Sequence, residues 1–543
     1  MIYGETVDAV NVDVDNSQAS VYYVSSSGSF TGGNVTNPQG DGVIVENDGT
    51  KSSSGSRLKI QPYDRMEAGG SKAAVTFVLH NSEIIGAGAA DSWGAYAWAT
   101  GQIDLTITNC NIRDWTYGAV AYDDGGGVTS AINGNYFSGC DDALYSNAVN
   151  LQDGSANWYT TIIQSEIIDL IDGNFDYTPW LGAGTDYLPG TTGFQSDYSI
   201  LFVDDASSQS GTDGRIQEGV IRGSGNIWVH EGVYYESVNF GGKAVTVKSM
   251  FDQDDDDSHI VNTVIDADVA VLGVDNASAV VFDSGEGSSS VLKGFTIRNG
   301  TGTKNPDDLN RLTGGAVYCN GSSPTISYCV MYDNSAVRGG AVACVDANPN
   351  LINCTLANND GANGSGISCY QSSPVIENTI VAYNTGTPGE AVYCLDGTSD
   401  PSLSCCDVYG NGGGDYTGCI TDQAGVDDNF NADPLFCGLG SNDYYVADIS
   451  QCADGNAFCG TQIGVFGVNC TDVYLCGDVN GDGLVDITDA VFLINFVFIL
   501  GSPAPDPMES GNVNCDSVVD ISDAVYLINY VFEPGWPAPC DCK

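Results

Sequence analysis

The stretch GGAVYCNGSSPTISYCVMYDNSAVRGGAVACVDANPNLINCTLANN, residues 314–359, decides the fold because it repeats one phrase. GGAVYC at 314–319 returns 25 residues later as GGAVAC at 339–344, and the same step leads to GSGISC at 364–369 and GEAVYC at 389–394. Each unit contains three short strand-like pieces separated by Gly, Pro or Asn, whereas helices need longer stretches with a period of about 3.6 residues. The repeat predicts that one unit is one lap of a coil of strands.

Three strands per lap, wound repeatedly, predict an all-β fold, the right-handed parallel β-helix. Leucine-rich repeats share the period, but their LxxLxL signature is missing. Residues one lap apart then lie above one another at the strand spacing of about 4.8 Å. Because side chains alternate along a strand, we expect inward columns at these positions and at the cysteines of the repeat: Val317, Val342, Ile367 and Val392; Ile326, Leu351 and Ile376; Met331, Leu356 and Val381.

Asparagines recur at two places in the lap. Asn353 and Asn378 fall between two strands, where a left-handed residue is needed and asparagine tolerates it. Asn334, Asn359 and Asn384 form another column, which predicts a ladder of stacked side-chain amides.

The 19 cysteines, without zinc-type CxxC pairs, favour an oxidising, extracytoplasmic compartment. Within the repeat they have two explanations: stacked Cα atoms lie within disulfide range, and a buried free thiol is a good small apolar filler. The odd number leaves at least one thiol free or paired between chains. A disulfide-rich closure of the coil is expected from six further residues, Cys419, Cys437, Cys452, Cys459, Cys470 and Cys476.

The charge of the chain is extreme, with 16 Lys plus Arg against 70 Asp plus Glu and a formal net charge of −54. Such a surface repels nucleic acid and anionic lipid and attracts divalent cations, above all calcium. Adaptation to salty or extracellular water is the alternative explanation. No segment approaches a membrane-spanning length, so we expect neither membrane insertion nor a nucleic-acid partner.

The first 200 residues follow the same pattern less regularly. LTITNCNIRD at 105–114 matches PTISYCVMYD at 324–333. We therefore predict two β-helices in tandem, over 1–210 and 211–472, with one continuous coil as the alternative. A short amphipathic helix at 215–222 is expected to cap the second coil. The N-terminus has no signal-peptide pattern, so a secreted protein would have lost its signal, or the chain begins inside a longer gene.

Residues from about 212 to 470 resemble the pectate-lyase-like superfamily of parallel β-helix proteins. The resemblance implies a catalytic or binding site on the outer face of the first strand, because many members cleave acidic polysaccharides. Lyases need carboxylates and a Lys or Arg base there, and hydrolases need two or three aspartates. In the regular repeats we expect that face to be flat and nearly uncharged, with these residues: Ala316, Ala341, Gly366, Ala391, Tyr318, Ala343, Ser368 and Tyr393.

One acidic pair stands apart from these repeats. GCDDALYS at 139–146 is similar to the paired aspartates of polygalacturonase-type hydrolases, but the His-Gly and Arg-Ile-Lys companions of that family are absent. Asp141 and Asp142 are therefore weak catalytic candidates, and an acidic turn is the usual explanation of such a pair.

The sharpest motif lies near the C-terminus, where DVNGDGLVDITD at 478–489 fits the twelve-residue calcium loop. The unit returns as NVNCDSVVDISD at 512–523, with Asn at position 1 and Ser517 in place of the glycine, and an apolar helix follows each copy. Two acidic turns on a helical hairpin are the alternative explanation. Two Ca²⁺ sites are predicted, with the side chains or, at position 7, the carbonyl of these ligands: Asp478, Asn480, Asp482, Leu484, Asp486 and Asp489; Asn512, Asn514, Asp516, Val518, Asp520 and Asp523.

The duplicated unit at 478–533 resembles the type I dockerin family and lies within an expected C-terminal module of 473–543. The resemblance implies a calcium-folded module that binds cohesin domains on scaffolds or cell surfaces. Loop position 10, where the family has a small hydroxyl residue, is Ile487 or Ile521 here, and the usual basic residues of the helices are Leu, Ile and Asn. Another surface protein, or docking within the molecule, therefore stays open beside cohesin.

Together these features predict a non-catalytic, extracellular or surface-displayed β-helix protein with a structural, adhesive or glycan-binding role. Its tyrosines would stack on sugars, and its C-terminal module would attach or assemble it. Self-association into arrays or filaments through exposed strand edges is part of this hypothesis. The alternative is an extracellular polysaccharide lyase or glycoside hydrolase acting on acidic polysaccharides, with its site in the irregular N-terminal coil.

Overall fold

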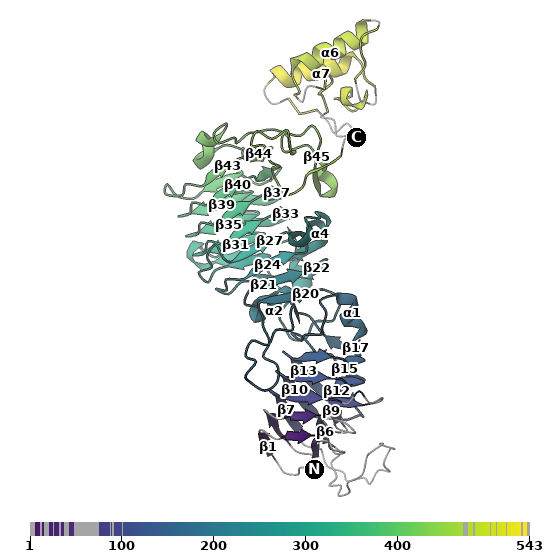
Figure 1. Ribbon diagram of the computed structural model, residues 1–543. Coiled ribbons are helices and arrows are strands. Elements are labelled where there is room, and N and C mark those ends of the chain that lie inside the picture. The colour runs from purple at the N-terminus through teal and green to yellow at the C-terminus, as the bar shows by residue number, and fades with distance from the viewer. Residues whose placement is uncertain are drawn as a thin grey trace.

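The computed structural model consists of two successive coils of parallel strands followed by a small helical module (Figure 1). It describes residues 6–10, 13–15, 21–24, 27–31, 34–36, 43–47, 75–86, 88, 92–99, 101–470, 476–481, 484–499, 501–505, 508–516, 518–533 and 536–539.

Three parallel sheets form the first coil, and we name them A1, B1 and C1. Sheet A1 contains β3 (Val21–Val24), β6 (Val43–Asn47), β9 (Trp93–Ala99), β12 (Tyr117–Asp123), β15 (Asp142–Ser146) and β17 (Ile171–Asp172). Sheet B1 contains β1 (Thr6–Val10), β4 (Ser27–Thr31), β7 (Val75–His80), β10 (Ile103–Thr108), β13 (Val128–Asn133), β16 (Gln152–Asp153) and β18 (Phe175–Asp176). Sheet C1 contains β2 (Asp13–Asp15), β5 (Asn34–Thr36), β8 (Glu83–Ile85), β11 (Asn111–Arg113) and β14 (Tyr136–Ser138).

The second coil repeats this order with sheets A2, B2 and C2. Sheet A2 contains β23 (Val238–Asn239), β26 (Val280–Phe282), β31 (Val317–Asn320), β35 (Val342–Val345), β39 (Ile367–Tyr370) and β42 (Val392–Cys394). Sheet B2 contains β19 (Trp180–Leu181), β20 (Ile200–Val203), β21 (Asn226–Val229), β24 (Thr246–Ser249), β27 (Val291–Lys293), β32 (Thr325–Ser327), β36 (Asn350–Ile352), β40 (Val375–Glu377) and β43 (Ser402–Ser404). Sheet C2 contains β22 (Gly232–Tyr235), β25 (Thr263–Asp266), β28 (Thr296–Arg298), β33 (Val330–Tyr332), β37 (Thr355–Ala357), β41 (Ile380–Ala382) and β44 (Asp407–Tyr409).

A fourth short sheet departs from the expectation of three strands per lap. It contains β29 (Thr303–Asn305), β30 (Arg311–Thr313), β34 (Ser335–Arg338) and β38 (Asp360–Asn363). The turn after Asn334 is long enough for β34 and β38 to pair in parallel between laps. A three-stranded sheet follows the second coil and contains β45 (Phe436–Gly438), β46 (Asp443–Ala447) and β47 (Val468–Cys470).

Helical segments are short within the coils. They are α1 (Gln164–Asp169), α2 (Arg215–Arg222), α3 (Phe251–Asp254), α4 (Ser258–Asn262) and α5 (Val269–Leu272), with 3-10 turns η1 (Pro306–Asp308), η2 (Gly418–Gln423) and η3 (Leu439–Ser441). The C-terminal module adds η4 (Met508–Gly511) and two longer helices, α6 (Ile487–Phe498) and α7 (Ile521–Phe532). Within the described residues, no helix is both long and apolar enough to cross a membrane.

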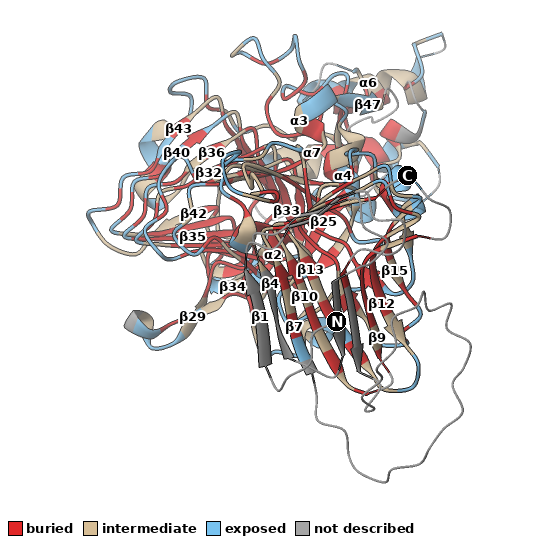
Figure 2. Cartoon of the chain, turned by 60° about the horizontal axis from the view of Figure 1, so that its bottom comes forward, coloured by how far each residue is buried: buried red, intermediate tan, exposed pale blue. Residues whose placement is uncertain are grey.

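The predicted lap of the second coil is confirmed by its strand register. Cys319 pairs with Cys344, Cys344 with Cys369, and Cys369 with Cys394 across four adjacent strands. The three expected apolar columns are buried in one continuous core, which Figure 2 shows in red. The predicted cap also forms, because α2 buries Ile216 and Val220 against that core.

Both predictions for asparagine are confirmed. Asn353 and Asn378 have left-handed φ angles of 51° and 48°. The Asn334 amide nitrogen donates to Asn359 Oδ1 at 3.0 Å, and Asn359 donates to Asn384 at 2.9 Å. The same contact continues from Asn384 to Asn411 at 2.9 Å, so the ladder extends one lap beyond the regular repeats.

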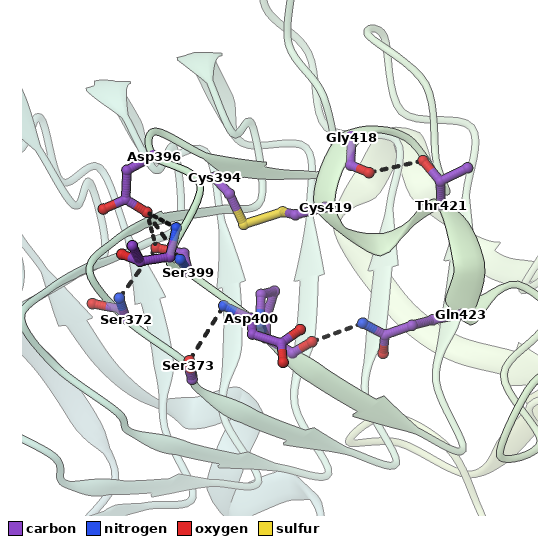
Figure 3. The surroundings of a disulfide bond; sticks show 12 residues. Ser372, Ser373, Cys394, Asp396, Ser399, Asp400, Gly418, Cys419, Thr421 and Gln423 are labelled. Atoms are coloured by element: carbon purple, nitrogen blue, oxygen red, sulfur yellow. Dashed lines mark hydrogen bonds between the residues drawn. A yellow bond between two sulfur atoms is a disulfide. The ribbon is translucent and has the colours of Figure 1, made fainter.

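Within the cysteine column the apolar-filler explanation is confirmed at three laps, and no disulfide joins two members of the column. Cys319, Cys344 and Cys369 are buried free thiols, while Cys394 forms a disulfide with Cys419 on η2 (Figure 3). Two further disulfides tie down the segment after the last strands, as expected for the closure: Cys405–Cys459 and Cys437–Cys470. Cys476 is disulfide-bonded as well, whereas Cys452 is a buried free thiol.

The prediction for the outer face of the regular repeats is wrong in two respects. Ala316, Ala341 and Ala391 point into the core, because the strands begin one residue later and two successive residues face inward there. Tyr318 and Ala343 do point outward, but they are only 3% and 1% exposed. Both residues belong to an apolar cluster with Val281 and Val345, and Tyr370 packs against this cluster.

The two coils form separate sets of hydrogen-bonded sheets, and the change falls between β18 and β19. Each coil also has a large apolar core, but Trp180 of β19 and Phe202 of β20 pack into the core of the first coil. The finer division into 1–210, 211–472 and 473–543 stays a proposal.

Candidate functional site

Sheet A1 of the first coil carries a partly exposed aromatic surface, which we call the aromatic face. Ala119 and Ala121 of β12 are buried in the core, while Tyr117 and Tyr122 lie on the opposite side. In strand β9, Ala95 and Ala97 are likewise buried in the core, while Trp93 and Trp98 lie on the opposite side. The aromatic face comprises Trp93, Tyr96, Trp98, Tyr117, Tyr122 and Tyr145, packed around the buried Val120.

The register of the strands places these rings in rows along the coil. Tyr117 lies beside Trp93, and Tyr122 lies beside Trp98. The rings of Trp98 and Tyr122 stack with centroids 4.5 Å apart, and those of Tyr117 and Tyr145 meet edge to face at 5.1 Å. Aromatic contacts thus run across three laps, from β9 to β15.

Glycines at the start of the strands allow this arrangement. A Cβ atom on Gly94 would lie 2.5 Å from the Gly118 carbonyl oxygen, and one on Gly118 would lie 2.7 Å from the Ala143 carbonyl oxygen. The inward side of the turn is therefore too crowded for a side chain. The preceding residues, Trp93 and Tyr117, project outward instead.

Two of the aromatic rows end on carboxylates. Asp142 is the register partner of Tyr117, and Asp172 is the register partner of Tyr145. Partial burial raises the pKa of Asp142, and the negative charges of Asp172 and Asp141 raise it further. Asp141 is exposed in the preceding turn. Of the two weak catalytic candidates, Asp142 alone is on the aromatic face.

The chemistry of this surface suits carbohydrate. Tyrosine and tryptophan offer apolar ring faces with a polar group at one edge, which matches a sugar ring with its C–H face and its hydroxyl groups. Contiguous exposed apolar surface usually marks a binding site. The aromatic face was not predicted from the sequence, where the outward tyrosines were expected in the second coil; its signal is WGAYAWA at 93–99 followed by YGAVAYD at 117–123.

The first C-terminal loop brings two predicted ligands together. Asp478 and Asp489 are both buried, at 6% and 0% exposure. Asp489 Oδ1 accepts hydrogen bonds from Val479 N at 2.7 Å and Asn480 N at 3.0 Å, while its Oδ2 accepts from Asp486 N at 2.9 Å. Burial raises the pKa of Asp489, and the charge of Asp478 raises it further. Asp482 lies outside the described residues.

The second loop repeats these contacts. Asp523 Oδ2 accepts from Asp520 N at 2.9 Å, and its Oδ1 accepts from Asn514 N at 3.3 Å. Asp516 Oδ1 accepts from Val518 N at 3.0 Å. Burial raises the pKa of Asp523, and Asp516 and Asp520 add to the effect. Asn512 at position 1 is half-buried.

Both loops fit calcium by their chemistry. The described ligand candidates offer oxygen atoms, as calcium prefers, and crowded carboxylates with raised pKa values would be relieved by a cation. The side chains of Leu484 and Val518 are 59% and 56% exposed, which suits a role through the carbonyl alone. Asp486 and Asp520 are also N-caps of α6 and α7, accepting from Thr488 N and Ser522 N. Among the described residues, three carboxylates do not converge in either loop.

The two helices after these loops form a duplicated surface. Their inner sides share one small core, in which Leu493 and Leu527 are fully buried. Their outer sides expose equivalent apolar residues at the same steps: Ile487, Val491 and Phe498 on α6, and Ile521, Val525 and Phe532 on α7. Each helix thus presents an unpartnered apolar stripe to solvent.

Comparison with known proteins identifies this module. Residues 476–532 match the dockerin type I domain family, so the chain carries a dockerin domain there. No curated protein has significant similarity to the chain. Type I dockerins bind calcium and dock onto cohesins of scaffold proteins, and proteins that carry them are typically extracellular or on the cell surface.

Proposed function

We propose that this chain is a non-catalytic β-helix protein that binds glycans on its aromatic face and is attached to a scaffold by its dockerin domain. The observation that carries the proposal is the set of partly exposed Trp and Tyr side chains across three laps of sheet A1. On the equivalent sheet A2 the partly exposed rings are Tyr370 and Tyr393 alone, and none of its strands contains a tryptophan.

The dockerin part of the proposal includes two calcium sites with the twelve ligands given above. The related hydrogen bonds of Asp489 and Asp523 support two sites rather than one. Cohesin is the proposed partner, and the exposed stripes of α6 and α7 are its proposed contacts. Extracellular or surface display follows from this attachment.

Glycan binding can be tested by incubating the full-length chain with insoluble cellulose, xylan, mannan and chitin, and with soluble uronate-rich polysaccharides. We expect retention on at least one polysaccharide without release of products. Stacking contributes about 0.5–1.5 kcal/mol per ring, so W98A/Y122A should weaken binding at least about five-fold. The matched control is Tyr393→Ala in sheet A2, which should bind normally. Equal loss in both variants, or retention on none of the polysaccharides, would contradict the proposal.

A glycoside hydrolase is the alternative, because Asp142 has a raised pKa and lies near Asp172 on the same face. A protonated carboxyl beside an ionised one is the requirement for glycosidic cleavage. A lyase is less suited, since the strands of sheet A1 contain neither Lys nor Arg. New reducing ends, abolished by Asp142→Asn, would establish the hydrolase and overturn the non-catalytic proposal.

Attachment can be tested separately by sedimentation of the chain with calcium, alone and with a cohesin. A one-to-one complex supports docking on a scaffold. The self-association alternative instead predicts dimers or longer assemblies of the chain alone.

A further inference from the structure

The carboxylates of the aromatic face have a defined place in its rows. One row runs from Trp93 through Tyr117 to Asp142, and the next runs through Tyr145 to Asp172. Because adjacent laps pair in register, each carboxylate lies one strand spacing beyond an aromatic residue, about 4.8 Å along the coil. A ligand stacked on the rings would therefore reach both carboxylates.

No described cation of the chain neutralises either carboxylate. Among the described residues, Asp142 and Asp172 have no ion pair with Lys, Arg or His. The six strands of sheet A1 contain no basic residue. Arg113 of the first coil pairs with Glu83 of sheet C1 instead. The aromatic face is thus also anionic, and the strands that form it contribute no basic side chain.

We propose that the glycan bound by this face is an amino-sugar polymer of the chitosan type, whose ammonium groups pair with Asp142 and Asp172 while its rings stack on the aromatic side chains. This inference rests on the proposed glycan-binding function and names the class of glycan. It departs from the acidic polysaccharides that the superfamily resemblance implies.

Charge selects among the glycans that could stack on these rings. A uronate chain would bring further negative charge to two carboxylates on a molecule with a formal net charge of −54. A neutral glucan would stack but leave the carboxylates without a partner. An ammonium group is attracted both by carboxylates and by the faces of Trp and Tyr.

The electrostatic state of Asp142 agrees with this choice. Its pKa is raised by partial burial and then by Asp172 and Asp141, so the site already holds more negative charge than its surroundings favour. A ligand cation placed there would stabilise the ionised form. Tyr145, whose pKa is raised by burial and by Asp172, marks the same concentration of negative charge.

The test compares three soluble hexasaccharides with the full-length chain in slightly acidic, low-salt buffer: the glucosamine hexamer, its N-acetylated form and cellohexaose. Titration calorimetry should give at least about ten-fold tighter binding of the glucosamine hexamer. That preference should decrease as salt is added, since exposed charges are screened. A polygalacturonate hexamer, with and without calcium, completes the set.

Two carboxamide variants locate the effect. D142N/D172N should lose the preference for glucosamine, while the matched variant Asp124→Asn, in the exposed loop after β12, should keep it. If the double variant does not fold, as judged by circular dichroism, Asp172→Asn alone should lower the preference at least about three-fold.

The outcomes separate the two proposals. Equal binding of all three hexasaccharides, or tighter binding of polygalacturonate with calcium, overturns the amino-sugar inference and leaves glycan binding in place. Binding of none of them, together with retention on none of the insoluble polysaccharides, overturns both proposals.

Discussion

The two coils share one plan of the lap but differ at the outward positions of their first sheet. In β9 and β12 those positions hold Trp98 and Tyr122, which stack on each other and remain partly exposed. At the corresponding position of β31, β35 and β39 the second coil has Asn320, Val345 and Tyr370, and the neighbouring ring of Tyr318 is buried.

Regular repetition and recognition are therefore separate properties of this molecule. The regular coil has no tryptophan on sheet A2, and it buries the outward Tyr318, Ala343 and Val345 in a small apolar cluster. The irregular coil keeps the inward alanines and glycines of the lap, which leaves its outward positions free to hold large rings. The same coil therefore forms with different outward side chains when its inward positions hold small or apolar residues.

Calcium removal should have the largest effect, and it should affect neither coil. Calcium loops fold around the ion, so chelation should unfold α6 and α7 and abolish cohesin binding. Far-UV circular dichroism and cohesin sedimentation measure both effects. Glycan binding by the first coil should persist; its loss on chelation would mean that the carboxylates of sheet A1 act through a calcium ion, contrary to our comparison.

Substituting the two tyrosines should separate a structural ring from a binding ring. Tyr318→Ala removes a buried ring and should lower the free energy of unfolding by about 3–5 kcal/mol, with glycan affinity unchanged. Tyr122→Ala removes a partly exposed ring and should cost about 1 kcal/mol but weaken glycan binding. Urea unfolding and calorimetry measure both; equal costs for the two variants would refute the difference between the faces.

Stacked asparagines should stabilise both coils, although they lie at different turns of the lap. Asn359 donates to Met331 O at 2.8 Å and to Asn384 Oδ1 at 2.9 Å, so Asn359→Ala should cost about 2–3 kcal/mol through buried unpaired groups. In the first coil the stacked pair lies at another turn, between sheets B1 and C1: Asn135 donates to Asn157 Oδ1 at 3.0 Å, and Asn135→Ala should cost a similar amount. Thermal unfolding would show it, and a negligible cost in the first coil would mean that the coils do not share this support.

The smallest expected effect concerns pH at the end of the first coil and the start of the second. Burial raises the pKa of Asp176 to about 6 and that of Glu236 to about 7. Because both values lie above those of the unfolded chain, the resulting stability is present in acid and is lost as pH rises through about 6 to 7. The free energy of unfolding should therefore fall by about 1–2 kcal/mol, which lowers the melting temperature by a few degrees.

Asp176→Asn should reduce the fall in melting temperature at the lower end of this pH range. This change separates the effect of one carboxyl from general charge repulsion. A melting temperature that rises across this interval, or a variant with the same pH profile as the parent chain, would contradict the assignment.

The sequence predicts the coil well because a 25-residue period fixes which residues stack. The inward column of Val317, the ladder of Asn359 and the cap helix at 215–222 follow from periodicity and local chemistry alone. The loops at 478–489 and 512–523 are equally easy to recognise in the sequence, because the spacing of their ligand candidates is local.

Features that depend on neighbours in space are harder to predict. Ala316 faces inward because of where its strand begins, and Tyr318 is buried by residues of other laps. The cysteine column shows the same limit: its spacing allows disulfides at every lap, yet Cys394 pairs and Cys369 does not. The aromatic face is recognisable once β9 and β12 are aligned, because its rings alternate with small inward residues.

Hydroxyl-radical footprinting with a bound oligosaccharide tests the central claim most directly, because it reports the exposure of individual side chains. The account predicts protection of Trp93, Trp98 and Tyr122 on sheet A1, with unchanged labelling of Tyr393 on sheet A2. Protection of Tyr393 without protection of the sheet A1 rings would contradict it.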